Sequence, residues 1–200
     1  VIERIIKKAL QSKHIDLIIL AISKKKSSEI LNWYHDSNIL EKYNYKVLFY
    51  IGSHDNIIQR CLKAAKQHDV DLIVDTSHDC IFFDYKLCDK LIKRLYDYNV
   101  DYSTNVITRT FPNGFDIQVY KRSTYEEIYD SGKYEPFYTG WNIFYAREKI
   151  YPKPRIINLE ADKNYYYPEW HLCLDTKEDL IVVEDIISFF ENFHNFSCYE

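Results

Sequence analysis

The amino-acid sequence predicts an α/β fold with a mainly parallel sheet. Short apolar runs without polar alternation occupy residues 16–22, 46–51 and 71–74, as expected for strands covered on both faces. Stretches with helical periodicity, at 55–67 and 85–98, lie between or after these runs. The connections are short, so strand and helix alternate as they do in right-handed parallel crossovers.

The other elements of the first half fit the same plan. Residues 1–10 place their apolar side chains on one side of a helix, and 29–34 form a second short helix. The segment 23–28 between strand and helix is polar and holds three lysines, which we interpret as solvated surface. Asp84 directly precedes the helix at 85–98 and is a suitable N-cap residue.

The second half is less regular. Residues 102–107 and 115–120 look extended and are separated by a turn at 111–114. The pairs Ser123/Glu126 and Thr176/Asp179 have the spacing of capping boxes. The first pair would open a helix over 123–129 and the second a closing helix over 177–193, with further strands at 155–159 and 171–174.

Composition sets limits on the class of protein. With 200 residues, of which 46% are hydrophobic, we expect a single domain over 1–200 with a real core. The net charge of −4 argues against a nucleic-acid binder. The longest apolar run, Leu17 to Ile22, is too short to span a membrane. Five cysteines without CxxC spacing favour reduced thiols in a cytoplasmic protein over a disulfide framework or a zinc site.

Candidate functional residues follow the apolar runs, because ligands of open α/β sheets bind beyond the carboxyl ends of the strands. Ser23, the segment 76–79 and Asp175 occupy such places. Two strand-end carboxylates, Asp79 and Asp175, would together suit Mg²⁺. Alternatively, each carboxylate stabilises a nearby helix start, although Asp175 lies outside the Thr176/Asp179 pair.

Other chemical motifs are missing from the sequence. It has no HExxH motif, no His/Cys grouping, no GxGxxG and no Walker A loop, which argues against zinc, dinucleotide and P-loop chemistry. Cys80, beside Asp79, has no obvious paired base, so we interpret it as a small buried thiol.

Several segments in order carry a resemblance to a known family. Its most specific parts are the Gly-Phe-Asp116 turn and the block Leu-Asp-Thr-Lys-Glu-Asp-Leu180. The other matching segments are Val-Ile-Glu-Arg-Ile5, Ile-Asp-Leu-Ile-Ile-Leu-Ala-Ile-Ser23, Gly-Ser-His-Asp-Asn-Ile-Ile-Gln-Arg60, Ala-Ala-Lys66, Ser-His-Asp-Cys80 and Thr-Arg-Thr-Phe-Pro-Asn-Gly-Phe-Asp116. Together the chain resembles the sugar-acid cytidylyltransferases, especially the spore-coat polysaccharide branch, with CMP-Kdo and CMP-sialate synthetases as more distant relatives.

The resemblance implies a three-layer α/β/α nucleotidyltransferase domain of the glycosyltransferase-A type. The family's first strand and its triphosphate-gripping loop would precede Val1. Since the chain also contains no methionine, we expect it to be a piece of a longer protein. The implied reaction joins CTP to a sugar or sugar acid, releases pyrophosphate and serves glycan or polysaccharide biosynthesis. Its partners would be CTP, a sugar acid and Mg²⁺, with no nucleic acid or membrane, and with a homodimer formed through about 108–150 as a further option.

The resemblance also implies roles for individual residues. Asp79 and Asp175 match the catalytic, metal-binding aspartates, and Asp116, Gln118 and Arg109 lie at the sugar pocket. The nucleotide-binding positions are Ser23, Arg60 and Ser77.

Near the expected site, this chain departs from the family pattern at His78, Ile81, Gln118 and Pro136. A catalytically degenerate module that binds a nucleotide-sugar or a partner protein therefore stays open beside the enzyme. A glycosyltransferase that uses a finished nucleotide-sugar is a third, less favoured option.

Overall fold

The computed structural model describes residues 2–190 and 197–199. The chain divides into two compact units. We call them unit one (Val1–His14, Val74–Val119 and Arg155–Glu200) and unit two (Ile15–Ile73 and Tyr120–Pro154). The single-domain expectation for 1–200 stays a prediction. None of the helices within the described ranges is long and apolar enough to cross a membrane.

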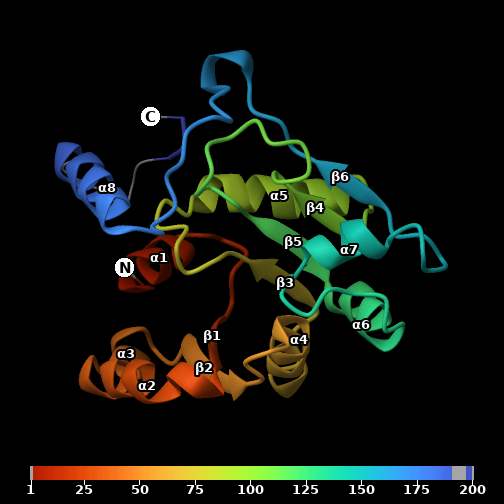
Figure 1. The fold of residues 1–200 in the computed structure, drawn as a ribbon, viewed down its shortest axis with the longest axis horizontal. Helices are drawn as coiled ribbons and strands as arrows, with labels where there is room; N and C mark the ends of the chain where they lie inside the picture. The colour runs from red at the N-terminus through yellow and green to blue at the C-terminus, as the bar shows by residue number, and fades with distance from the viewer. Residues whose placement is uncertain (1, 191–196, 200) are drawn as a thin grey trace. The chain divides into compact units, whose positions relative to one another are not determined.

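Unit two contains a parallel pair of strands with helices packed on it. Strands β1 (Ile18–Ser23) and β2 (Val47–Gly52) lie side by side (Figure 1). Their parallel register runs from Ile18 opposite Val47 to Ser23 opposite Gly52. Helix α4 (Ile57–Gln67) contacts both strands and α6, and its first turn is capped by the Asn56 side chain. The other helical segments of unit two are η1 (Lys24–Lys26), α2 (Ser27–Asp36), α3 (Ile39–Lys42), α6 (Arg122–Asp130) and α7 (Trp141–Ala146).

Unit one contains most of a second sheet. Its strand order is β3-β5-β4-β6, and β4 (Tyr102–Thr104) pairs in parallel with β6 (Ile156–Asn158). Strands β3 (Leu72–Asp75) and β5 (Gln118–Lys121) contain the points where the chain passes between the units. Helix α5 (Tyr85–Asp97) packs on β4 (Figure 1). The buried residues of α5 are all apolar. The remaining helical segments are α1 (Ile2–Ala9), η2 (Lys163–Tyr165) and α8 (Lys177–Phe189).

The predicted α/β class with parallel strand pairing is confirmed. Both the Asp84 cap of α5 and the Thr176/Asp179 capping box of α8 are present. Helix α8 ends at Phe189, and residues 191–193 of the expected closing helix lie outside the described residues. The short helices α3 and α7 were not expected, and the strand expected at 102–107 ends at Thr104.

Three expectations from the sequence are wrong. The Ser123/Glu126 capping box does not form, because the Arg122 N–H bonds to the Asp71 carbonyl and α6 starts directly from the strand. Residues 171–174 make a single bridge, from His171 to Asn113, instead of a strand. The strands expected to be covered on both faces are only partly buried: within β1 Ile22 alone is fully buried, and no residue of β3 is.

Candidate functional site

The loop between β3 and α5 carries Asp79 and lies against the segment that carries Asp175. The backbone N–H of Leu174 donates to the Asp79 carbonyl oxygen over 3.1 Å. Residues 171–174 do not form a strand because the backbone N–H groups of Leu172 and Leu174 donate to the loop carbonyls of Asn113 and Asp79. The structure therefore brings the two predicted metal-binding segments of unit one side by side.

The two carboxylates have different surroundings. Asp79 is half-buried, and its Oδ1 is buried without a hydrogen-bond partner among the described residues. Asp175 is exposed, and its Oδ2 lies 3.1 Å from His171 Nε2. In the described part of the chain, each belongs to a different cluster of three potential metal ligands: Asp79 with Cys80 and Cys173, and Asp175 with His171 and Asp179. A metal ion shared by the two aspartates thus stays a prediction.

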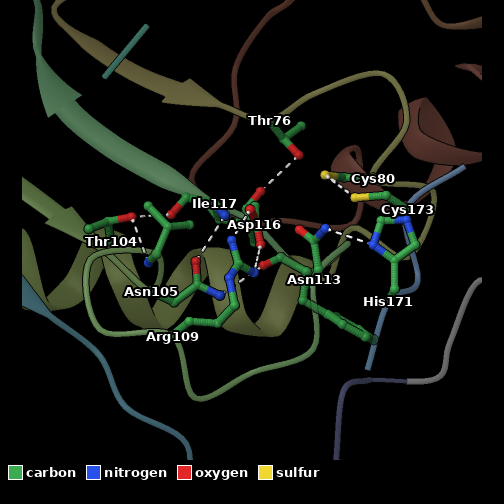
Figure 2. Close-up of polar contacts among 12 residues, drawn as sticks. Thr76, Cys80, Thr104, Asn105, Arg109, Asn113, Asp116, Ile117, His171 and Cys173 are labelled. Carbon is green, nitrogen blue, oxygen red and sulfur yellow. Dashed lines mark hydrogen bonds and ion pairs between the residues drawn. The ribbon is translucent and has the colours of Figure 1, made fainter. Parts of the chain in front are cut away.

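His171 is held in place by Asn113, in the turn at residues 111–114. The Asn113 side-chain amide donates to His171 Nδ1 over 3.1 Å (Figure 2). The backbone N–H of Leu172 donates to the Asn113 carbonyl over 2.8 Å. With Nδ1 as an acceptor, the proton of the neutral ring lies on Nε2, toward Asp175. The Asp175 side chain contacts His171 and takes no part in the capping box of α8. Only its backbone N–H contacts that box, by donating to Asp179 Oδ2.

Gly114 makes this close approach feasible. Its φ of +111° is a conformation that suits glycine, and an added Cβ would lie 2.6 Å from the Leu172 carbonyl oxygen. We expect Gly114→Ala to reduce the free energy of unfolding by at least about 2 kcal/mol, from backbone strain and displacement of the 171–173 segment. Urea unfolding curves measure this loss.

Gly132→Ala is the matched control for that variant. Gly132 also has a positive φ, of +66°, but an added Cβ there meets nothing within 4 Å. Only the conformational cost of about 1 kcal/mol should appear. Equal losses in the two variants would contradict the close approach at Gly114.

The predicted sugar-pocket residues Arg109 and Asp116 form a bidentate ion pair in unit one. Both guanidinium-to-carboxylate distances are 2.8 Å (Figure 2). Hydrogen bonding to Asp116 raises the pKa of Arg109 above its ordinary value, so the guanidinium stays charged. The Asp116 carbonyl also accepts from Thr76 Oγ1 over 3.0 Å, which fastens this turn to the end of β3.

Two buried residues that sequence reasoning missed hold the segment around Asp116. The amide of Asn105, 1% exposed, donates to the Phe115 carbonyl and accepts from the Ile117 N–H, each over 2.9 Å. Thr104 Oγ1 donates to the Ile117 carbonyl over 2.8 Å (Figure 2). In the sequence, a polar stretch after a short strand was the only sign of such a role. That stretch does not reveal which backbone segment these side chains bind.

Gln118, also predicted at the sugar pocket, has a structural role in the sheet. Its Oε1 accepts from the Tyr102 hydroxyl over 2.7 Å, and its Nε2 donates to Asp75 Oδ2 over 3.4 Å. Burial raises the pKa of Tyr102, which keeps the phenol a neutral donor. Asp75, a third strand-end carboxylate, was not singled out from the sequence.

Two of the predicted nucleotide-binding residues lie in unit two, each beside Gly52. Ser23 ends β1 opposite Gly52, and Arg60 of α4 packs on Gly52, where an added Cβ would lie 2.7 Å from Arg60 Cγ. Arg60 Nη1 donates to the Ser53 carbonyl over 2.7 Å. The third residue, Ser77, is exposed in the loop of unit one. The nucleotide-binding role of all three stays a prediction.

Unit two also has a hollow of about 740 Å³ that holds none of the predicted site residues. Charged side chains dominate its lining, which consists of Glu127, Asp130, Ser131, Lys133, Glu148, Lys149, Ile150 and Tyr151.

Solved structures with the same fold point to one class of protein. A cytidylyltransferase from Leptospira borgpetersenii serovar Hardjo-bovis (strain JB197) matches with a TM-score of 0.80 and 25% identity, over 99% of this chain and 79% of that one. A CMP:2-keto-3-deoxy-manno-octonic acid synthetase solved with CTP matches with a TM-score of 0.59 and 12% identity, over 94% and 87%. The second likeness is one of fold alone. The fold is therefore nucleotidyltransferase-like.

Sequence comparison gives the family. The spore coat polysaccharide biosynthesis protein SpsF of Bacillus subtilis (strain 168) is 26% identical over 180 residues, which are 89% of this chain and 70% of that protein. The family model described as Cytidylyltransferase matches residues 1–196, and the chain belongs to this cytidylyltransferase family. The resemblance seen in the sequence is thereby confirmed.

Proposed function

We propose that this cytidylyltransferase transfers CMP from CTP to a sugar acid or a related sugar and releases pyrophosphate. The observation that carries the proposal is the Leu174–Asp79 backbone bond, which fastens together the two segments that bear Asp79 and Asp175. By the resemblance, Asp79 and Asp175 themselves match the family's metal-binding aspartates. The polysaccharide role printed for SpsF supports a sugar acceptor.

Asp79 and Asp175 are the residues that would hold Mg²⁺. Their donor atoms fit a hard cation, which prefers carboxylate oxygens, and the buried Oδ1 of Asp79 lacks a hydrogen-bond partner among the described residues. Bound there, Mg²⁺ would neutralise charge on the phosphate oxygens of CTP.

The chain's own groups would position the acceptor sugar. Both oxygens of the Asp116 carboxylate accept from Arg109, and the Asp116 carbonyl accepts from Thr76, so the side chain is held at a fixed place. Each carboxylate oxygen has a lone pair beyond the one that Arg109 uses, and these can accept hydrogen bonds from sugar hydroxyls. In phosphoryl transfer such positioning contributes much of the catalysis, because the protein supplies little covalent chemistry.

The test is release of pyrophosphate by the full-length protein with CTP, Mg²⁺ and a panel of sugar acids and neutral sugars. We expect turnover with CTP and at least one of these acceptors, and little with UTP. An absence of pyrophosphate release with every acceptor would overturn the proposal.

A binding module without turnover is the second candidate, and one contact favours it. His171 Nε2 occupies Asp175 Oδ2, one of the atoms that would hold the cation. Calorimetry with CTP and Mg²⁺ separates the candidates: heat of binding without pyrophosphate release favours the module.

A further inference from the structure

Two buried cysteines from distant parts of the chain face each other beside Asp79. The sulfur atoms of Cys80 and Cys173 are 4.0 Å apart, although 93 positions separate the residues (Figure 2). Their exposed fractions are 2% and 6%. One ligand atom each from Asp79, Cys80 and Cys173 lies within 4.8 Å of the other two.

The distance between the sulfurs is close to that of two thiolates on one metal ion. Zn–S bonds of about 2.3 Å at a tetrahedral angle put two sulfurs about 3.8 Å apart. A disulfide requires about 2.05 Å. A separation of 4.0 Å therefore needs only a small contraction to bind zinc, and roughly a halving to form a disulfide.

The donor atoms also fit a thiophilic ion. Among the described residues, the buried Oδ1 of Asp79 has no hydrogen-bond partner. Two sulfurs and one carboxylate oxygen are a ligand set that zinc accepts, with water as the fourth ligand. The hydrogen bond to Cys173 and burial raise the pKa of the Cys80 thiol. Because the thiolate is the form that binds a metal ion, binding releases thiol protons to solvent.

We propose that Asp79, Cys80 and Cys173 form a binding site for a thiophilic divalent cation such as Zn²⁺. The site is distinct from the hard-cation site proposed above, with which it shares only Asp79. It does not depend on nucleotide transfer, because its test needs neither CTP nor turnover. The sequence argued against zinc because the two cysteines are far apart along the chain, and only folding pairs them.

Cobalt is a suitable probe because Co²⁺ takes zinc sites and absorbs light when thiolates bind it. The full-length protein, reduced and freed of metal with a chelator, is titrated with Co²⁺ and then with Zn²⁺. We expect a thiolate-to-cobalt charge-transfer band that saturates at one equivalent and is removed by Zn²⁺.

Three variants test the ligand set. Cys80→Ser and Cys173→Ser each remove one thiolate ligand. Each variant should lower the intensity of the charge-transfer band and weaken binding by more than about tenfold. Asp79→Asn should keep the thiolate band and weaken binding. Cys88→Ser is the matched control, since it removes a fully buried thiol of α5 that is outside the cluster and should bind as the wild type does.

Measurements on the wild-type protein decide the matter even if a cysteine variant fails to fold. X-ray absorption of the zinc complex should report two sulfur ligands with lighter atoms completing the shell, and zinc should raise the melting temperature. The proposal is overturned if the reduced wild type shows no thiolate band, or if the spectrum reports no sulfur. Formation of a Cys80–Cys173 disulfide in air by a protein that binds no metal when reduced would also overturn it.

Discussion

Asp79→Asn is expected to lower the rate of pyrophosphate release at least about a hundredfold while the fold is retained. The substitution keeps the size of the side chain and removes its negative charge, which the proposed Mg²⁺ site requires. The Asp79 backbone carbonyl, which accepts the Leu174 N–H, is unchanged, so the two segments should stay together. Steady-state assays with CTP and the best acceptor give the rate, and circular dichroism checks the fold.

The matched control for this prediction is Asp130→Asn, the same chemical change at the exposed end of α6. It should leave the rate within about twofold of wild type, since Asp130 belongs to neither cluster of potential metal ligands and exposed substitutions of this kind have small effects. If Asp79→Asn retains wild-type turnover, Asp79 does not hold an essential ion and the proposed site is wrong.

The alternation of strands and helices could be predicted because it depends on local pattern. The runs that became β1, β2 and β3 are apolar and bounded by polar residues, and the helices after β2 and β3 have one apolar face. Helix caps were also predictable where the cap uses local atoms, as at Asp84 and Thr176. The predicted capping box at Ser123 was wrong because a long-range bond, from the Arg122 N–H to the Asp71 carbonyl, decides where α6 begins.

The candidate site was less predictable because its geometry depends on contacts between distant segments. The positions of Asp79 and Asp175 followed from the strand-end rule and the resemblance, but their contacts with Cys173 and His171 did not. Residues 171–174 have the apolar character of a strand, yet their donors bond to loop carbonyls. Asn105 has no sequence signal of its own, because an asparagine amide can bond to any nearby backbone.

The largest effect on stability is expected from Asp84→Ala, because one buried carboxylate satisfies three backbone donors. Asp84 is 0% exposed, and its Oδ1 accepts from the N–H groups of Lys86 and Leu87 over 2.8 and 3.3 Å. Its Oδ2 accepts from the Cys198 N–H over 2.7 Å, so the same side chain fastens a C-terminal segment to the start of α5. The charge also lies at the positive end of the helix dipole.

Removing this carboxylate leaves those three donors without their partner. We expect a loss of about 3 kcal/mol, from the helix cap and the charged hydrogen bond to Cys198. For a chain of this size that corresponds to a melting temperature lower by roughly 10 °C. Urea and thermal unfolding measure the loss, and Asp84→Asn, which keeps one acceptor oxygen, should fall between the alanine variant and wild type.

Asp97→Ala is the matched control, because Asp97 is the exposed last residue of the same helix and pairs only at the surface with Lys93. Its loss should stay within about 0.5 kcal/mol, since exposed ion pairs contribute little and an acid at a helix C-terminus opposes the dipole. An Asp84→Ala variant as stable as this control would mean that water replaces the carboxylate at all three donors. The fastening of residues 197–199 to α5 would then contribute nothing to the fold.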